Sequence, residues 1–145
     1  MLDLYGGPSG NRGLTTTVAS RQLEFEASVK ALPLDEILTA EERSRLKLIK
    51  IDIEGGEGPV VRRFLDTLDL YRPDVALIVE VSPSDEWREI FERMRNAGFA
   101  AFVIANSYSR DWYLKHRHQI TPPAPIVQPP VELGDVLFIK DLSPG

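Results

Sequence analysis

The sequence predicts an α/β fold, because strand patterns and helix patterns alternate along its second half. The clearest strand, residues 75–81, is apolar without alternation, which is typical of a strand covered on both faces of a sheet. The clearest helix runs between Ser84 and Gly98, with its apolar residues on one face at helical spacing. We therefore expect a single α/β domain over residues 1–145, with helices on both faces of its sheet.

Less regular patterns precede these elements. Residues 14–18 and 25–29 are β-branched or alternating, as half-buried strands are, and we expect them to form a hairpin or a flank of the sheet. Residues 33–38 begin with proline, which suits the first turn of a short helix, and residues 39–45 begin with a Thr-x-x-Glu capping box. A nearly continuous apolar strand interrupted by lysines follows over residues 46–51.

The remaining elements alternate in the same way. Residues 59–70 predict a helix, because proline stands at the first position and apolar side chains recur on one face. Gly98 supplies a left-handed stop before a strand over residues 99–105, and a final strand occupies residues 136–140. The segment 106–134 has no sustained periodicity, and its prolines favour extended, unpaired backbone.

Composition excludes several classes of function. The net charge of -5 argues against nucleic acid or an anionic membrane as partner, since both need a basic surface. The absence of cysteine excludes disulfides, thiolate zinc sites and a cysteine nucleophile. No apolar run reaches the length of a membrane span and no secretory leader is evident, so we expect a cytoplasmic protein.

Three acidic residues follow or end two successive predicted strands. Asp52 and Glu54 come directly after residues 46–51, and Glu80 lies near the end of residues 75–81. Parallel strands joined by a right-handed crossover are often neighbours about 5 Å apart, so the three carboxylates are expected to converge at one edge of the sheet. Such a group suits a general base or a cation site, and we assign no metal to it.

The same residues have a purely structural interpretation. Glu57 then caps the helix that begins at Pro59, Glu54 faces solvent, and Asp52 alone has a local role. Gly55 belongs to a glycine-rich turn that either lets a ligand approach the main chain or only makes the turn tight. It is not a phosphate loop, because the lysine and hydroxyl of that motif are absent.

Histidine chemistry is concentrated at His116 and His118, downstream of Trp112 and Tyr113. A histidine titrates near neutral pH and can act as a base or a metal ligand, or contact a substrate. A solvated loop is the alternative, since no further histidine completes a site.

Residues 50–57, Lys-Ile-Asp-Ile-Glu-Gly-Gly-Glu, carry a resemblance to a known family. Together with residues 33–38, 71–73 and 77–80, they resemble the second half of an FkbM-type methyltransferase. The resemblance implies a partial class I, Rossmann-like methyltransferase sheet whose last strand is antiparallel and inserted between the two preceding strands. It also implies transfer of a methyl group from S-adenosyl-L-methionine, the cofactor, to a hydroxyl oxygen of a sugar or another small-molecule substrate.

By this resemblance, Asp52 and Glu54 orient the acceptor hydroxyl or take its proton, and Glu80 supports them. Gly55 and Glu57 are expected to contact the substrate. His116 is expected to contact it as well.

No cofactor-binding residue is assigned, because the strand and glycine-rich loop that open the family's domain are absent from this sequence. The glycines of residues 6–13 are closer to a later loop of the family, on the substrate side. We therefore expect a truncated or excised half of the domain. The alternative is a non-catalytic α/β scaffold or interaction module completed by another chain. In either case we expect the edge along residues 46–51 to pair with a second copy or a partner chain, or to be covered by residues 14–29.

Overall fold

The computed structural model describes residues 2–6, 24–106, 111–112, 114 and 121–140. Contacts divide the chain into two compact units. One contains Met1–Leu46 with Ile51–Arg72, and the other contains Lys47–Lys50 with Pro73–Gly145.

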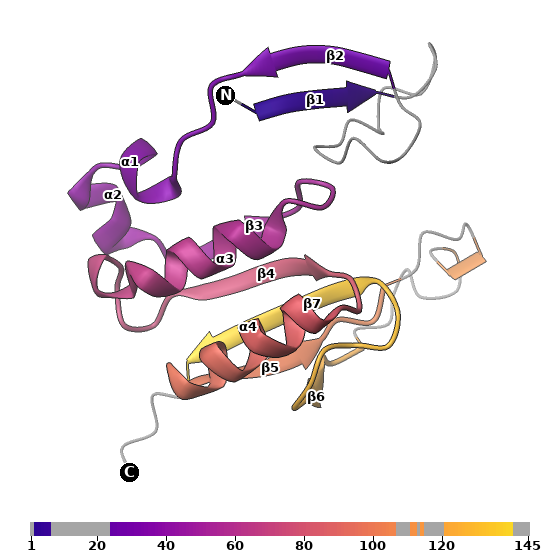
Figure 1. Ribbon diagram of the computed structural model, residues 1–145. Coiled ribbons are helices and arrows are strands. Elements are labelled where there is room, and N and C mark those ends of the chain that lie inside the picture. The colour runs from indigo at the N-terminus through magenta and orange to yellow at the C-terminus, as the bar shows by residue number, and fades with distance from the viewer. Residues whose placement is uncertain (1, 7–23, 107–110, 113, 115–120, 141–145) are drawn as a thin grey trace. The chain divides into compact units, whose positions relative to one another are not determined.

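The first unit opens with an antiparallel pair of strands, β1 (Leu2–Gly6) and β2 (Glu24–Val29) (Figure 1). The strand expected at residues 25–29 is therefore confirmed as β2, but its partner β1 was not predicted. Five residues ending in glycine carry too little alternation to signal a strand. Residues 14–18, the other strand expected here, lie outside the described residues.

Two short helices follow, α1 (Leu34–Ile37) and α2 (Ala40–Arg45). The capping box at α2 is confirmed, because the Glu42 amide donates to the Thr39 hydroxyl oxygen and the Thr39 amide donates to the Glu42 carboxylate. Both helices are close to the shortest that form, so they depend on caps and contacts rather than on propensity.

The predicted helix over residues 59–70 is wrong at both ends. The helix α3 (Glu57–Asp66) begins two residues earlier, and Pro59 is tolerated in its first turn because the missing N–H has no helical partner there. At the other end the Thr67 amide bonds to the carbonyls of both Arg63 and Phe64, and a separate 3-10 turn, η2 (Leu68–Leu70), follows.

The second unit is built on a sheet with the strand order β3-β4-β7-β5-β6. Its strands are β3 (Leu48–Ile51), β4 (Ala76–Val81), β5 (Phe99–Val103), β6 (Ala124–Ile126) and β7 (Gly134–Lys140). The last strand, β7, lies antiparallel between β4 and β5. The predicted α/β class and the inserted antiparallel last strand are therefore confirmed.

The strand β6 corrects the expectation of unpaired backbone in the proline-rich segment. It pairs antiparallel with β5, and Pro125 stands opposite Phe102. Proline removes one ladder donor, which is compatible with pairing only at an edge, and β6 is the last strand in the sheet.

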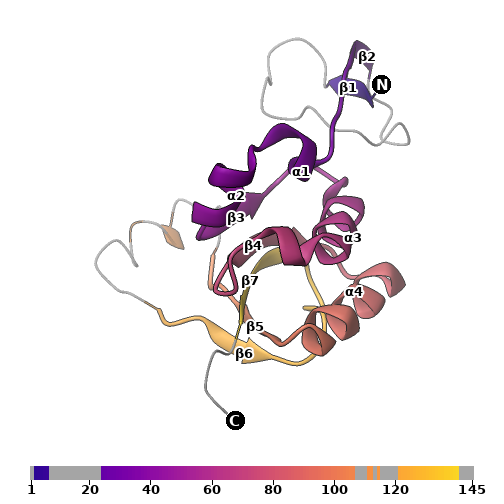
Figure 2. The ribbon, with the colours of Figure 1, turned by 90° about the vertical axis from the view of Figure 1, so that its left-hand side faces the viewer.

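The helix α4 (Asp85–Asn96) packs beside the sheet within the second unit (Figure 2). The Ser84 hydroxyl caps its first turn, and Gly98, with φ +86°, ends it as predicted. Its buried side chains are Trp87, Ile90, Phe91 and Met94. The Phe91 ring meets Phe138 of β7 edge to face, with 5.1 Å between centroids.

Within the described part of the chain, no helix has the length and apolar character needed to cross a membrane.

Candidate functional site

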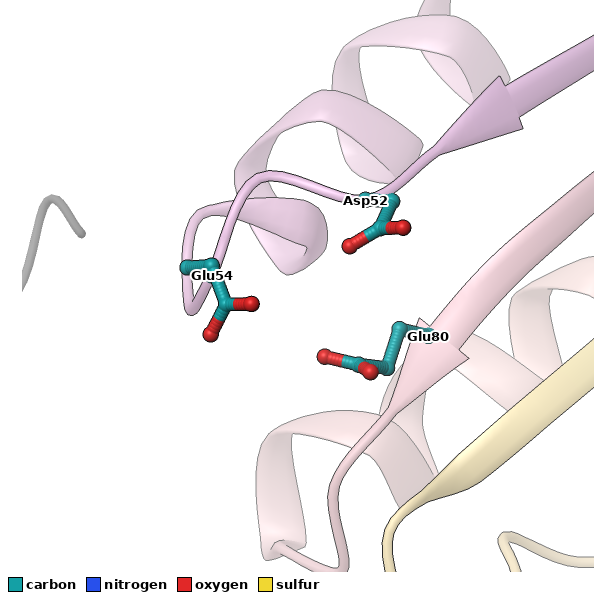
Figure 3. Close-up of side chains that lie close together, drawn as sticks. All are labelled: Asp52, Glu54 and Glu80. Atoms are coloured by element: carbon teal, nitrogen blue, oxygen red, sulfur yellow. The ribbon is translucent and has the colours of Figure 1, made fainter. Parts of the chain in front are cut away.

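Carboxylates gather where β3 ends. Asp52 directly follows β3 and is exposed, whereas Glu54, in the next turn, and Glu80, in β4, are half-buried. One carboxylate oxygen from each residue lies within 4.8 Å of the others (Figure 3). The expected convergence of the three acids is thus present, while the chemical roles assigned to them stay predictions. The oxygens are close enough to share a cation, but carboxylates also gather without one, and we assign no ion.

Strand geometry explains how Asp52 and Glu80 are positioned. The Ala76 amide donates to the Lys47 carbonyl at 2.9 Å and links the beginnings of β3 and β4. Burial alternates along both strands, so that the residue after buried Ile51 turns to the opposite face. Glu80 lies between two buried valines for the same reason.

A buried carboxylate fixes the loop that carries Glu54. Glu57, only 6% exposed, accepts the Ile53 amide at 3.0 Å through Oε1. Its Oε1 and Oε2 also accept the Gly55 amide, at 3.1 and 3.0 Å. Glu57 is the first residue of α3, so its carboxylate reaches back to the loop instead of capping a helix that starts at Pro59. The group that we expected to contact substrate is therefore bonded to the loop.

The turn itself has an uncommon backbone. Glu54 has φ +54° and Gly55 has φ +105°. A left-handed conformation costs a residue with a side chain about 1–2 kcal/mol, whereas glycine adopts it readily. The two hydrogen-bonded amides on either side of Glu54 hold it in this conformation. Strain of this kind, held by surrounding contacts, is a feature of functional loops.

Two further polar residues lie beside Glu80 and were missed in the sequence. Asp135 of β7 stands directly opposite Glu80, and the Asn106 side-chain amide donates to the Asp135 carboxylate at 3.1 Å. These three residues line a cavity of about 130 Å³ together with Ile104, Leu133 and Gly134. The last strand was predicted to start after Asp135, so this residue showed no strand pattern of its own.

Two sequence-predicted features have no described position. His116 lies outside the described residues. So do residues 7–13, which contain most of the first glycine-rich segment.

Comparison with known proteins identifies the family. Residues 3–100, more than half of the chain, match the family model for the methyltransferase FkbM domain. The matched segment includes all three converging carboxylates and Glu57, whose carboxylate accepts the Ile53 and Gly55 amides. No curated protein and no solved structure matches the chain. The chain therefore belongs to the FkbM methyltransferase family.

Proposed function

We propose that this chain acts in methyl transfer from S-adenosyl-L-methionine to a hydroxyl oxygen of a small molecule such as a sugar. Its membership of the FkbM family supports methyl transfer, since that family generally uses this cofactor. The observation that carries the assignment is the gathering of Asp52, Glu54 and Glu80 within 4.8 Å at the end of β3. We assign these carboxylates to the acceptor side of the reaction.

The chemistry required of the protein is modest. A carboxylate oxygen accepts a hydrogen bond from the acceptor hydroxyl and so fixes the direction of its lone pairs. The same oxygen takes the proton that the acceptor hydroxyl gives up. We give Asp52 the role of proton acceptor because it is the exposed member of the group. Glu54 and Glu80, both half-buried, orient the hydroxyl.

The described residues do not fit the cofactor by themselves. A glycine-rich turn before a helix can hold an anionic group through its free amides. Here the Ile53 and Gly55 amides are already bonded to Glu57, and the carboxylate of Glu54 adds negative charge to the same turn. We therefore assign no cofactor contact to this turn and derive no step through the cofactor.

The test is a methyl-transfer assay. The chain is incubated with millimolar, isotopically labelled S-adenosyl-L-methionine and a mixture of monosaccharides and methyl glycosides, and labelled products are resolved by mass spectrometry. We expect Asp52→Asn to reduce labelling at least about a hundredfold, as removal of a general base does. Glu80→Gln should also reduce labelling, because the acceptor hydroxyl is then less well oriented. The control Asp69→Asn, at an exposed residue of η2, should label normally. Normal labelling by both site variants would contradict the assignment.

A second proposal follows from the place of β3 in the sheet. We infer that the chain pairs with a second copy or with a partner chain along residues 46–51. Within the described residues β3 has β4 as its one neighbour in the sheet, and Leu48 is 49% exposed. An exposed edge with an apolar side chain favours addition of another strand. This interaction is compatible with a scaffold role in the absence of catalysis.

A further inference from the structure

A larger cavity lies in the first unit and is not lined by any of the three site carboxylates. Its volume is about 410 Å³, and it is bordered by the segment before α1, by α1 and by the first two turns of α3. Its walls are mostly apolar, with side chains of Leu32, Leu34, Ile37, Val60 and Phe64. A volume of roughly 300–1,000 Å³ with apolar walls and few polar groups is typical of small-molecule sites.

One ion pair supplies the polar part of the wall. Arg63 donates to Asp35 through two parallel bonds, Nε to Oδ1 at 3.0 Å and Nη2 to Oδ2 at 2.6 Å. The Asp35 side chain is only 8% exposed, whereas that of Arg63 is about half exposed. This geometry engages one edge of the guanidinium and leaves the two Nη1 hydrogens for another acceptor.

The charge of this wall is balanced. Among the residues that line the cavity, Arg63 and Asp35 are the charged ones, and they neutralise each other at hydrogen-bond distance. The Arg43 guanidinium, which donates to the Asp35 and Leu38 carbonyls, does not line it. A charged ligand would lose its hydration without gaining a free counter-charge. A neutral carbonyl oxygen, in contrast, finds two fixed donors.

Ionisable groups with altered properties also gather here. The hydrogen bond from Arg63 lowers the pKa of Asp35, and burial raises the pKa of Tyr71, which lines the same cavity. Within the described residues the Tyr71 hydroxyl is buried and makes no hydrogen bond of normal geometry, although the neighbouring Thr67 side chain acts to lower its pKa. Groups perturbed in this way gather at ligand sites more often than elsewhere.

A structural role accounts for part of this arrangement. The Asp35–Arg63 pair joins α1 to α3, and α1 is too short to hold its place alone. That role does not account for the apolar side chains left in water around the cavity, of which Ile37 is 60% exposed. An apolar ligand would cover them and gain roughly 25 cal/mol for each Å² of buried apolar surface.

We propose that this cavity binds an uncharged small molecule with an apolar body and a carbonyl-type acceptor, which Arg63 holds through Nη1. The ligand would rest on α3, the helix whose first residue clamps the Ile53–Gly55 turn. The proposal does not depend on methyl transfer. A binding measurement alone therefore tests it.

The test is a titration of the whole chain with benzamide, followed through backbone amide signals by NMR. Benzamide carries an aromatic body and a neutral carbonyl, and benzoate and benzylammonium offer the same ring with opposite charges. We expect saturable shifts at Leu34, Ile37 and Val60 with benzamide, at millimolar affinity, and binding about tenfold weaker for both ions.

Matched variants locate the site. Val60→Phe places a ring in the cavity and should abolish the benzamide shifts, whereas Val127→Phe adds the same bulk at an exposed position that does not line it. The spectrum outside the first unit reports whether each variant is folded. Absence of saturable shifts in the natural chain, equal binding by folded Val60→Phe, or tighter binding of either ion would overturn the proposal.

Discussion

The carboxylate of Glu57 holds the backbone of Gly55, because both of its oxygens accept the Gly55 amide, at 3.1 and 3.0 Å. A charged acceptor makes a stronger hydrogen bond than a neutral one, and burial of Glu57 shields these bonds from water. The residue between the two clamped amides, Glu54, has a left-handed backbone. Position and direction of the Glu54 carboxylate therefore depend on a residue that does not itself belong to the acidic group.

Glu57→Gln tests this dependence. The glutamine oxygen can take the place of Oε1, which accepts both amides, but an N–H₂ group then replaces Oε2. That group is a donor that faces the Gly55 amide, itself a donor, and it is left buried without an acceptor. We expect the free energy of unfolding in urea to fall by about 1–3 kcal/mol, the usual cost of leaving a buried group unsatisfied. Methyl transfer should fall as well, because the turn that carries Glu54 is no longer fixed.

The control for this change is Glu92→Gln on the exposed surface of α4. It makes the same chemical substitution and should shift the unfolding free energy by less than about 0.5 kcal/mol. Equal effects of the two variants would show that the Glu57 hydrogen bonds contribute nothing specific.

Two substitutions at Glu54 separate the effect of its carboxylate from the effect of its left-handed backbone. Glu54→Gly and Glu54→Ala both remove the carboxylate, but only alanine retains the Cβ that disfavours φ +54°. We expect the glycine variant to be more stable than the alanine variant by up to about 1 kcal/mol in chemical denaturation. Both should lose methyl transfer to the same extent. A more stable alanine variant would mean that the turn changes conformation freely.

The positions of Asp52 and Glu80 could be predicted from the sequence because they depend on regular elements. Each acid ends or follows an apolar run, and successive runs in an α/β protein tend to become neighbouring strands. Tertiary context was needed for the rest. The clamp by Glu57 requires a folded turn, and the usual preference for an acid at a helix start predicts a cap instead.

The pairing of strands at the sheet edges also could not be predicted from local sequence patterns. The strand β6 consists of three residues with a proline at its centre, and its pairing depends on the free edge that β5 offers. Asn106 and Asp135 come together because β7 is inserted beside β4 and β5. Neither residue lies in a periodic segment that would mark it as part of a site.

The Asp35–Arg63 pair should make stability depend on acid pH. The Arg63 hydrogen bond lowers the pKa of Asp35 in the folded chain, so the ionised form is favoured by folding. Its contribution is complete above the ordinary aspartate pKa and is lost as pH falls through the lower folded-state pKa. Thermal unfolding of the natural chain and of Asp35→Asn, measured from neutral to strongly acid pH, should show a gap that closes in this range.

Asp69→Asn, which removes an exposed aspartate of η2, serves as the comparison. Its midpoint should stay parallel to that of the natural chain throughout the same pH range. If the gap between the natural chain and Asp35→Asn stayed constant with pH, the pair would contribute through packing and not through charge.

Cofactor affinity provides a separate prediction. Because the Ile53 and Gly55 amides are bonded to Glu57 and no opening glycine-rich strand-loop motif is present, the purified chain should bind S-adenosyl-L-methionine weakly. Calorimetric titration should give a dissociation constant well above the low-micromolar range. A low-micromolar value would show that another segment of the chain builds the pocket.

The edge strand β3 gives the last prediction. The Lys47 carbonyl faces β4, so the backbone N–H and C=O of the next residue, Leu48, face the other side of the strand. We expect a second copy to pair there, which would give a concentration-dependent hydrodynamic mass and slow hydrogen exchange at the Leu48 amide. Leu48→Lys should weaken this association, because a charge on an edge disfavours strand addition, and Val127→Lys should not. A monomer with a fast-exchanging Leu48 amide at all concentrations would show that the edge stays open in solution and that pairing along residues 46–51 requires a different chain.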